Sequence, residues 1–108
     1  MAIFERTFTG NFDVLLKKVE KAVLDGSLSA TLEESADYRT PQGRCSVRVF
    51  ERYSYSGSNR VSMSVTLFQA GEEIHLCAIT SGGSQAVLFK VNTWGEEAFL
   101  ETLEDALS

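Results

Sequence analysis

A two-residue period in the middle of the chain restricts the fold more than any other feature. Between about residues 27 and 79, apolar side chains recur at every second position, most regularly in Val61–Leu67, where they alternate with serine and threonine. Successive side chains of a strand point to opposite faces, so this alternation predicts a sheet with one apolar face. Turn residues at Thr40–Gly43 and Gln69–Glu72 divide the segment into consecutive strands.

A helix is predicted near the N-terminus, after a short first strand at Ile3–Phe8. Its apolar residues have the spacing of a one-faced helix and are Phe12, Leu15, Leu16, Val19, Ala22 and Val23. Asn11 is the expected N-cap and Gly26 the expected left-handed C-cap. This segment is the clearest helix in the sequence.

A second helix is predicted to begin at Thr93 and to run to the C-terminus. Thr93 and Glu96 have the spacing of a capping box, in which each side chain accepts from a free backbone N–H of the other residue. Ala86–Val91, between a glycine-containing loop and this helix, is predicted to be a sixth strand. The expected element order is therefore β-α-β-β-β-β-β-α.

These elements indicate one α+β domain over residues 1–108, because 108 residues is an ordinary single-domain size. We predict a two-layer fold: a curved, mainly antiparallel sheet of five to six strands with both helices on its apolar face. If the sheet wraps the C-terminal helix, the result would look like a helix-grip or TATA-binding-protein-like fold. That analogy rests on element order and carries little functional weight.

The composition excludes several classes of protein. A formal net charge of -5 and a pI near 4.8 argue against nucleic-acid binding. No segment resembles an export signal or a membrane span, and the longest uncharged stretch, Ile74–Phe89, is interrupted by polar residues and glycine. Two cysteines, Cys45 and Cys77, are too few for a disulfide framework. We expect a cytoplasmic protein with free thiols and no cofactor.

Strand parity argues against a metal or catalytic site. His75 and Cys77 share the face opposite Ile74, whereas Cys45 has the parity of Val47 and is expected in the core. The three side chains are therefore not expected to surround one ion. A nucleophile also needs a nearby base held by a third group, and no suitable carboxylate lies at matching parity on this strand. We predict no metal ligands and no catalytic residues, with an enzyme as the third hypothesis.

Arginine is concentrated between Arg39 and Arg60, which includes five arginines and one acid. Arg44, Arg48 and Arg52 share one parity and form a row that we call the arginine row. It is expected on the solvated face, where it is either simply exposed or pairs with a carboxylate or phosphate partner. Aromatic residues beside arginine are typical of interfaces. The predicted self-association surface comprises Arg44, Arg48, Phe50, Arg52 and Phe68, and its association is expected to weaken in salt.

A small-ligand site is the alternative hypothesis. An apolar or anionic molecule would lie between the curved sheet and the C-terminal helix. The expected lining is Met63, Ser81, Gly82, Gly83, Ser84, Gln85, Trp94 and Phe99. The glycines and serines of this loop lack the lysine of a phosphate-binding loop, so a plain connecting loop is the simpler interpretation.

Three blocks of the sequence resemble a family of short bacterial proteins of unknown function, found mainly in Gram-positive bacteria. They are Arg44–Tyr55, Ile79–Val87 and Asn92–Leu100, and the resemblance extends over nearly the whole chain. It implies a stand-alone cytoplasmic domain and assigns no catalytic or ligand-binding residue. The function predicted from the sequence is thus a non-enzymatic interaction module that forms a homodimer.

Overall fold

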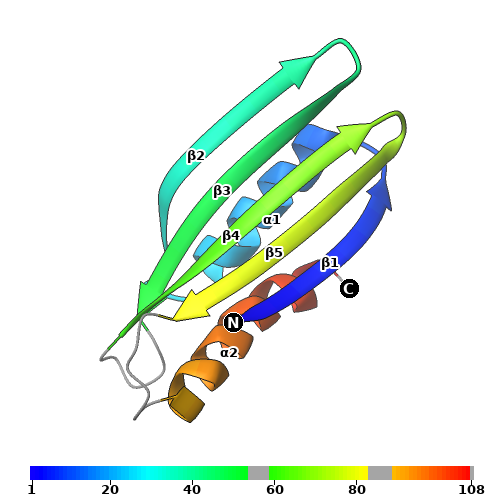
Figure 1. The fold of residues 1–108 in the computed structure, drawn as a ribbon. Coiled ribbons are helices and arrows are strands. Elements are labelled where there is room, and N and C mark those ends of the chain that lie inside the picture. Colours follow the sequence, from blue (N-terminus) through cyan, green and yellow to red (C-terminus); the bar gives the residue numbers. More distant parts are fainter. Residues whose placement is uncertain (54–58, 83–88, 108) are drawn as a thin grey trace.

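The computed structural model describes residues 1–53, 59–82 and 89–107, with the backbone alone for residues 89–94. Within these ranges the chain forms five strands and two helices in the order β-α-β-β-β-β-α (Figure 1). They are β1 (Ala2–Thr9), α1 (Phe12–Asp25), β2 (Thr31–Thr40), β3 (Gly43–Tyr53), β4 (Arg60–Ala70), β5 (Glu73–Gly82) and α2 (Phe89–Leu107). The predicted α+β class is confirmed, with five strands in the described residues.

All five strands belong to one antiparallel sheet in the order β1-β5-β4-β3-β2. Strands β2 to β5 form a meander, because each strand pairs with the next one in the sequence. Short turns join β2 to β3 and β4 to β5 at the predicted positions. Gly71, with φ of +73°, provides the left-handed conformation of the β4–β5 turn. Strand β2 starts at Thr31, later than the alternation from Leu28 suggested, and has a register shift between Leu32 and Glu34.

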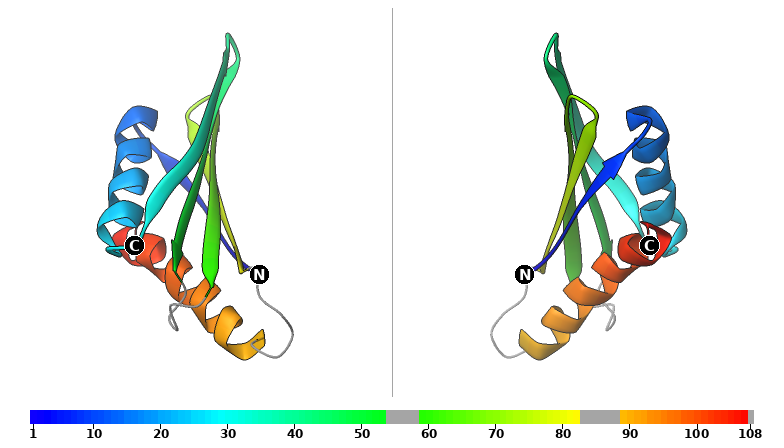
Figure 2. Two further views of the ribbon diagram at one scale, coloured as in Figure 1. Left: turned by 90° about the vertical axis from the view of Figure 1, so that its left-hand side faces the viewer. Right: turned by 90° about the vertical axis from the view of Figure 1, so that its right-hand side faces the viewer.

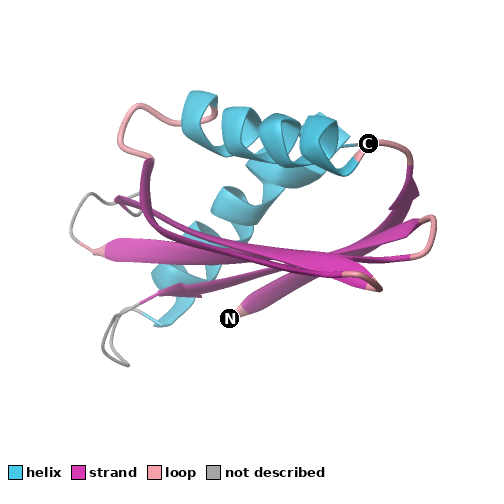
Figure 3. Cartoon of the chain, turned by 90° about the horizontal axis from the view of Figure 1, so that it is seen from above, coloured by secondary structure: helices cyan, strands magenta, loops and turns pink. Residues whose placement is uncertain are grey.

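The two helices are arranged differently relative to the sheet. Figure 2 shows α1 over one face, while α2 runs obliquely from the end of α1 past the end of the strands. Helix α2 contacts β5, β4, β1 and α1. A strict two-layer arrangement is therefore not confirmed. Seen from above, no described helix or strand covers the face of the sheet opposite α1 (Figure 3).

The hydrophobic core lies between the helices and the alternating residues of β4 and β5. Its members on these strands are Val61, Met63, Val65, Leu67, Ile74, Leu76 and Ala78, all fully or almost fully buried. Phe12, Val19 and Val23 of α1 and Phe99 and Leu103 of α2 pack against them. The sequence prediction for the apolar faces of β4 and β5 is confirmed.

Both ends of α1 are set by local contacts. The Asn11 side chain accepts a hydrogen bond from Val14 N at 2.9 Å, as predicted for an N-cap. Gly26 is right-handed, with φ of -74°, so the predicted left-handed C-cap is wrong. A Cβ at Gly26 would lie 2.8 Å from the carbonyl oxygen of Ala22 and 3.0 Å from Cβ of Thr102. Glycine is needed here because α1 and α2 approach each other closely.

Helix α2 begins earlier than its capping pattern indicated. It starts at Phe89, so Thr93 lies within the helix and the predicted capping box is wrong. The Glu96 carboxylate is buried and pairs with the amino group of Met1. Of the predicted sixth strand, residues 86–88 lie outside the described residues, and Phe89–Val91 are helical.

Candidate functional site

Strand β3 has the opposite orientation to the one predicted from its valines. Val47 and Val49 lie on the uncovered face, whereas the alternate positions face the helices. Ser46, Arg48 and Phe50 are 1%, 8% and 0% exposed. The expected exposure of Arg48 and Phe50 is therefore wrong, and Arg44 and Arg52 are half-buried on the helix side.

The two ends of the arginine row rest on helix side chains. The guanidinium carbon of Arg44 lies 4.0 Å from the Phe12 ring centroid, and Nη2 of Arg44 lies 3.0 Å from Oδ1 of Asp13. The guanidinium carbon of Arg52 lies 4.7 Å from the ring centroid of Phe99. An arginine can cover apolar surface with its stem while its planar head stacks on an aromatic ring. Arginine therefore takes the place of aliphatic residues on this part of the sheet.

Arg48, in the middle of the row, joins three elements. Its Nε donates to Oε2 of Glu20 on α1 at 2.9 Å, and its Nη1 lies 3.1 Å from Oδ1 of Asp37 on β2. Ser46 Oγ donates to the same Asp37 oxygen at 2.6 Å. The hydrogen bonds from Ser46 and Arg48 lower the pKa of Asp37 below its ordinary value of 3.8. This network fastens β2 and β3 to α1, so its residues stabilise the fold.

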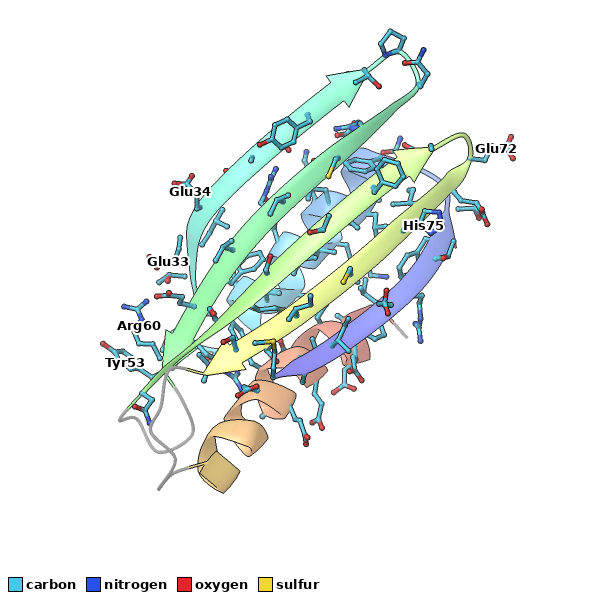
Figure 4. The ribbon with its side chains drawn as sticks, in the orientation of Figure 1. Glu33, Glu34, Tyr53, Arg60, Glu72 and His75 are labelled. Carbon is cyan, nitrogen blue, oxygen red and sulfur yellow. The ribbon has the colours of Figure 1, made fainter. Side chains whose placement is uncertain are left out.

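The remaining member of the predicted interface, Phe68, lies on the other side of the sheet. We call that side, away from α1, the open face; Figure 4 looks onto it. Strand pairing places Tyr38, Cys45, Phe68 and His75 in one row across β2, β3, β4 and β5. The rings of Phe68 and His75 are stacked with centroids 6.3 Å apart, and Phe68 is 47% exposed. The open face therefore carries exposed aromatic surface at this end.

The middle of the open face combines apolar and hydroxyl side chains. The central strand, β4, contributes Ser64 and Thr66, which lie between apolar residues of β3 and β5. Val47 and Val49 are half-buried, and Ile79 is exposed on β5 in the row of Val49. Burial, together with the charge of Glu5, raises the pKa of the Cys77 thiol. The thiol therefore stays protonated at neutral pH and acts as an apolar contact surface.

Charged side chains lie toward the margins of this face. Glu34 on β2 and Glu5 on β1 occupy the two edge strands. Glu51 pairs with Arg60 at 2.8 Å near the end of β3, where Arg60 also lies 3.4 Å from Glu33 (Figure 4). The open face thus has apolar and hydroxyl side chains in its middle and a mainly acidic rim.

A shallow depression of about 240 Å³ is present on the open face, near the turns that join β2 to β3 and β4 to β5. Its lining is Tyr38, Thr40, Gln42, Gly43, Arg44, Cys45, Phe68 and Ala70. The exposed rings of Tyr38 and Phe68 contribute to this lining, with Cys45 on the strand between them. The depression can accept an apolar group.

The prediction that Cys45 is a core residue is wrong, because Cys45 shares the open face with His75 and Cys77. Phe68 stands between Cys45 and His75 in the cross-strand row. Within residues 1–53, 59–82 and 89–107, no group of three or more His, Cys, Asp or Glu side chains is arranged to hold a metal ion.

The alternative ligand site falls partly within the described residues. Met63 and Phe99 are fully buried in the core, and Ser81 and Gly82 are half-buried at the end of β5. Gly83, Ser84 and Gln85 lie outside the described residues, as does the side chain of Trp94. The pocket between sheet and C-terminal helix stays a prediction.

Comparison with family models gives a match over the entire sequence. The model of a family of unknown function, DUF6054, matches residues 1–108. The chain belongs to DUF6054. The predicted resemblance to a family of unknown function is confirmed, and a Gram-positive origin remains an expectation. No match was found among curated proteins. In the part of this DUF6054 chain that the structure describes, no helix is long and apolar enough to cross a membrane.

Proposed function

We propose that this DUF6054 chain is a non-enzymatic interaction module that forms a homodimer through the open faces of two sheets. The observation that carries the proposal is an uncovered sheet face on which the half-buried valines of β3 and the exposed Ile79 of β5 lie on either side of the hydroxyl side chains of β4. Stacked sheets pack about 10 Å apart with interdigitated side chains, which suits the half-buried valines of β3. The free thiols of Cys45 and Cys77 are compatible with a cytoplasmic location, which belongs to the same proposal.

The size of the open face suits a second copy of the chain. Five strands spaced by about 4.8 Å, each about ten residues long, give a face of about 24 Å by 33 Å. That area is about 800 Å² for each partner, the usual size of a stable protein interface. A two-fold axis would place the same mixture of apolar and hydroxyl side chains on both sides of the interface, so one surface provides its own complement.

The exposed aromatic residues provide anchors for such a dimer. Tyr38 and Phe68 are among the large side chains that the described residues leave exposed, and both flank the depression of about 240 Å³. Aromatic side chains in apolar pockets contribute most of the binding energy in many interfaces. In a symmetric dimer, an apolar side chain of each protomer can fill the depression of the other.

Native mass spectrometry and light scattering of a matched pair of variants test the proposal. Val49→Lys places a charge in the centre of the open face, whereas Val14→Lys places it on the exposed side of α1, where Val14 is 65% exposed. We expect a dimer for the wild type and for Val14→Lys, and a monomer for Val49→Lys. Circular dichroism should show that Val49→Lys is folded. A monomeric wild type, or a dimer unaffected by Val49→Lys, would overturn the proposal.

A small apolar ligand is the second candidate function, favoured by the depression between Tyr38 and Phe68. The same native spectra distinguish it, because a ligand binder would be a monomer carrying extra mass. Phe68→Ala should then remove the bound mass, while Val14→Lys should retain it.

A further inference from the structure

A second surface lies on the helix side of the sheet, opposite the open face, at the ends of the two long hairpins. Strand pairing places Arg39, Arg44 and Gln69 in one row across β2, β3 and β4. Here a polar depression of about 420 Å³ is lined by Arg39, Thr40, Pro41, Gln42, Gly43, Arg44, Gln69 and Gly71. The lining therefore combines two guanidinium groups with two amide side chains.

Positive charge is in excess around this depression. Arg39 and Arg44 are direct cross-strand partners, a pairing of like charges that destabilises a sheet. Asp13 is the carboxylate bound to Arg44, and hydrogen bonding to Arg44 together with the charges of Arg44, Arg39 and Lys17 lowers the pKa of Asp13 against the opposing effect of desolvation. Three cations thus act on one carboxylate, in a chain whose net charge is -5. An additional anion would relieve this imbalance.

Arg44 already shows the geometry of oxyanion recognition. Its Nη1 and Nη2 donate to the two carboxylate oxygens of Asp13 at 3.3 and 3.0 Å. The Phe12 ring supports the guanidinium plane from below, which holds the fork in place. The positive end of the α1 dipole, at Asn11, lies at the same end of the molecule.

We propose that this depression binds a phosphate group, with Arg39 as the main cation and Arg44 shared between the ligand and Asp13. Gln42 and Gln69 provide amide donors to further oxygens. The site lies on the other face of the sheet from the proposed homodimer, and it shares Thr40, Gln42, Gly43 and Arg44 with the depression on the open face. Arg39, Gln69 and Gly71 line this site alone. A free phosphate and a phosphate on a lipid headgroup present the same chemistry to these residues.

Titration of the ¹⁵N-labelled protein with inorganic phosphate, at ionic strength matched by sodium chloride, tests the site. We expect saturable shifts of the Gly43 and Gly71 amides. Arg39→Ala should weaken this binding by about tenfold. Lys21→Ala is the matched control, because it also removes one cation. Lys21 is on α1, pairs with Asp25 and does not line the depression. Equal affinities for the two variants, or shifts that sodium chloride alone reproduces, would exclude free phosphate as the ligand, and together with vesicle binding that does not depend on Arg39 they would overturn the proposal.

A second arm identifies the source of the phosphate. For the same variants, we would measure the fraction of protein that floats with phosphatidic acid vesicles and compare it with the fraction that floats with phosphatidylcholine vesicles. Arg39-dependent flotation without saturable shifts in free phosphate assigns the site to a lipid headgroup and supports the proposal. Arg39-dependent shifts without flotation support it for a free phosphate. Absence of an Arg39 effect in both arms overturns it.

Discussion

Nε of Arg48 lies 2.9 Å from Oε2 of Glu20, and this ion pair joins strand β3 to helix α1 at the margin of the core. The Arg48 side chain is 10% exposed and that of Glu20 is 29% exposed. A pair of this kind is costly to break, because the partner that remains has lost its counter-charge in a partly desolvated place. Arg48 is therefore part of the framework that holds α1 on the sheet.

Replacing Arg48 with methionine should lower the free energy of unfolding by about 1–3 kcal/mol. The methionine keeps the apolar stem but leaves Glu20 and Asp37 without their guanidinium partner. Urea unfolding followed by circular dichroism measures the change. Lys21→Ala, which removes an exposed pair with Asp25, should cost less than about 0.5 kcal/mol. Equal losses in the two variants would contradict the structural role of Arg48.

Acid should weaken the fold through Asp37. Hydrogen bonds from Ser46 and Arg48 give its carboxyl a pKa below 3.8 in the folded state, so the unfolded chain binds the proton more readily. The stabilisation is present above pH 3.8 and is lost as the pH falls through the lower, folded pKa. Thermal melts between about pH 2 and pH 7 should show a smaller loss of Tm below pH 4 in Asp37→Asn than in the wild type. Parallel curves would exclude Asp37 as a source of the acid sensitivity.

Periodicity predicted most of the sheet because β4 and β5 follow the simple rule that apolar side chains face the core. Val61, Met63, Val65 and Leu67 alternate with hydroxyl residues, and burial agrees with them. The start of α2 was not predictable in this way. Thr93 and Glu96 have the spacing of a capping box, but that spacing also occurs within a helix, and here the buried Glu96 pairs with Met1 instead.

Strand β3 shows why the candidate site was predicted on the wrong face. Valine is more apolar than arginine, so parity assigned Val47 and Val49 to the core. That choice neglected two facts: arginine can cover a core with its stem, and a sheet can leave an apolar face uncovered. Phe50 was the available signal, since a large aromatic residue shares the parity of the arginines and is fully buried. Glu20 and Asp37, the carboxylates that satisfy Arg48, come from other elements and are not identifiable without the fold.

Gly26→Ala should destabilise the protein by about 1–3 kcal/mol, although alanine favours helices. The added Cβ would lie 2.8 Å from the Ala22 carbonyl oxygen of α1 itself and 3.0 Å from Cβ of Thr102 on α2, so both the last turn of α1 and its contact with α2 must shift. Denaturant midpoints provide the measurement. Asp25→Ala, at the exposed neighbouring position, serves as the control and should change the stability by less than about 0.5 kcal/mol. Increased stability of Gly26→Ala would show that the helices do not approach this closely.

Salt should strengthen the proposed homodimer or leave it unchanged, in contrast to the weakening expected of an interface built on the arginine row. The middle of the open face has no charged side chain among Val47, Val49, Ser64, Thr66, Cys77 and Ile79, its edge strands carry Glu5 and Glu34, and each chain has a net charge of -5. Two such faces repel each other electrostatically while their centres attract. Raising the ionic strength from about 0.01 M to about 1 M shortens the screening length from about 30 Å to about 3 Å, which removes the repulsion and preserves apolar burial.

Sedimentation equilibrium at the two salt concentrations gives the dimer Kd directly. Glu5→Gln removes one acidic group per protomer from the face, so it should tighten the dimer at low salt and reduce the response to added salt. Glu72→Gln, in the β4–β5 turn and away from the open face, is the charge-matched control and should retain more of the wild-type salt response (Figure 4). A dimer that dissociates as salt is added would instead require attractive ion pairs across the interface. Such a result would contradict a contact built on Val49 and the other apolar side chains of the open face.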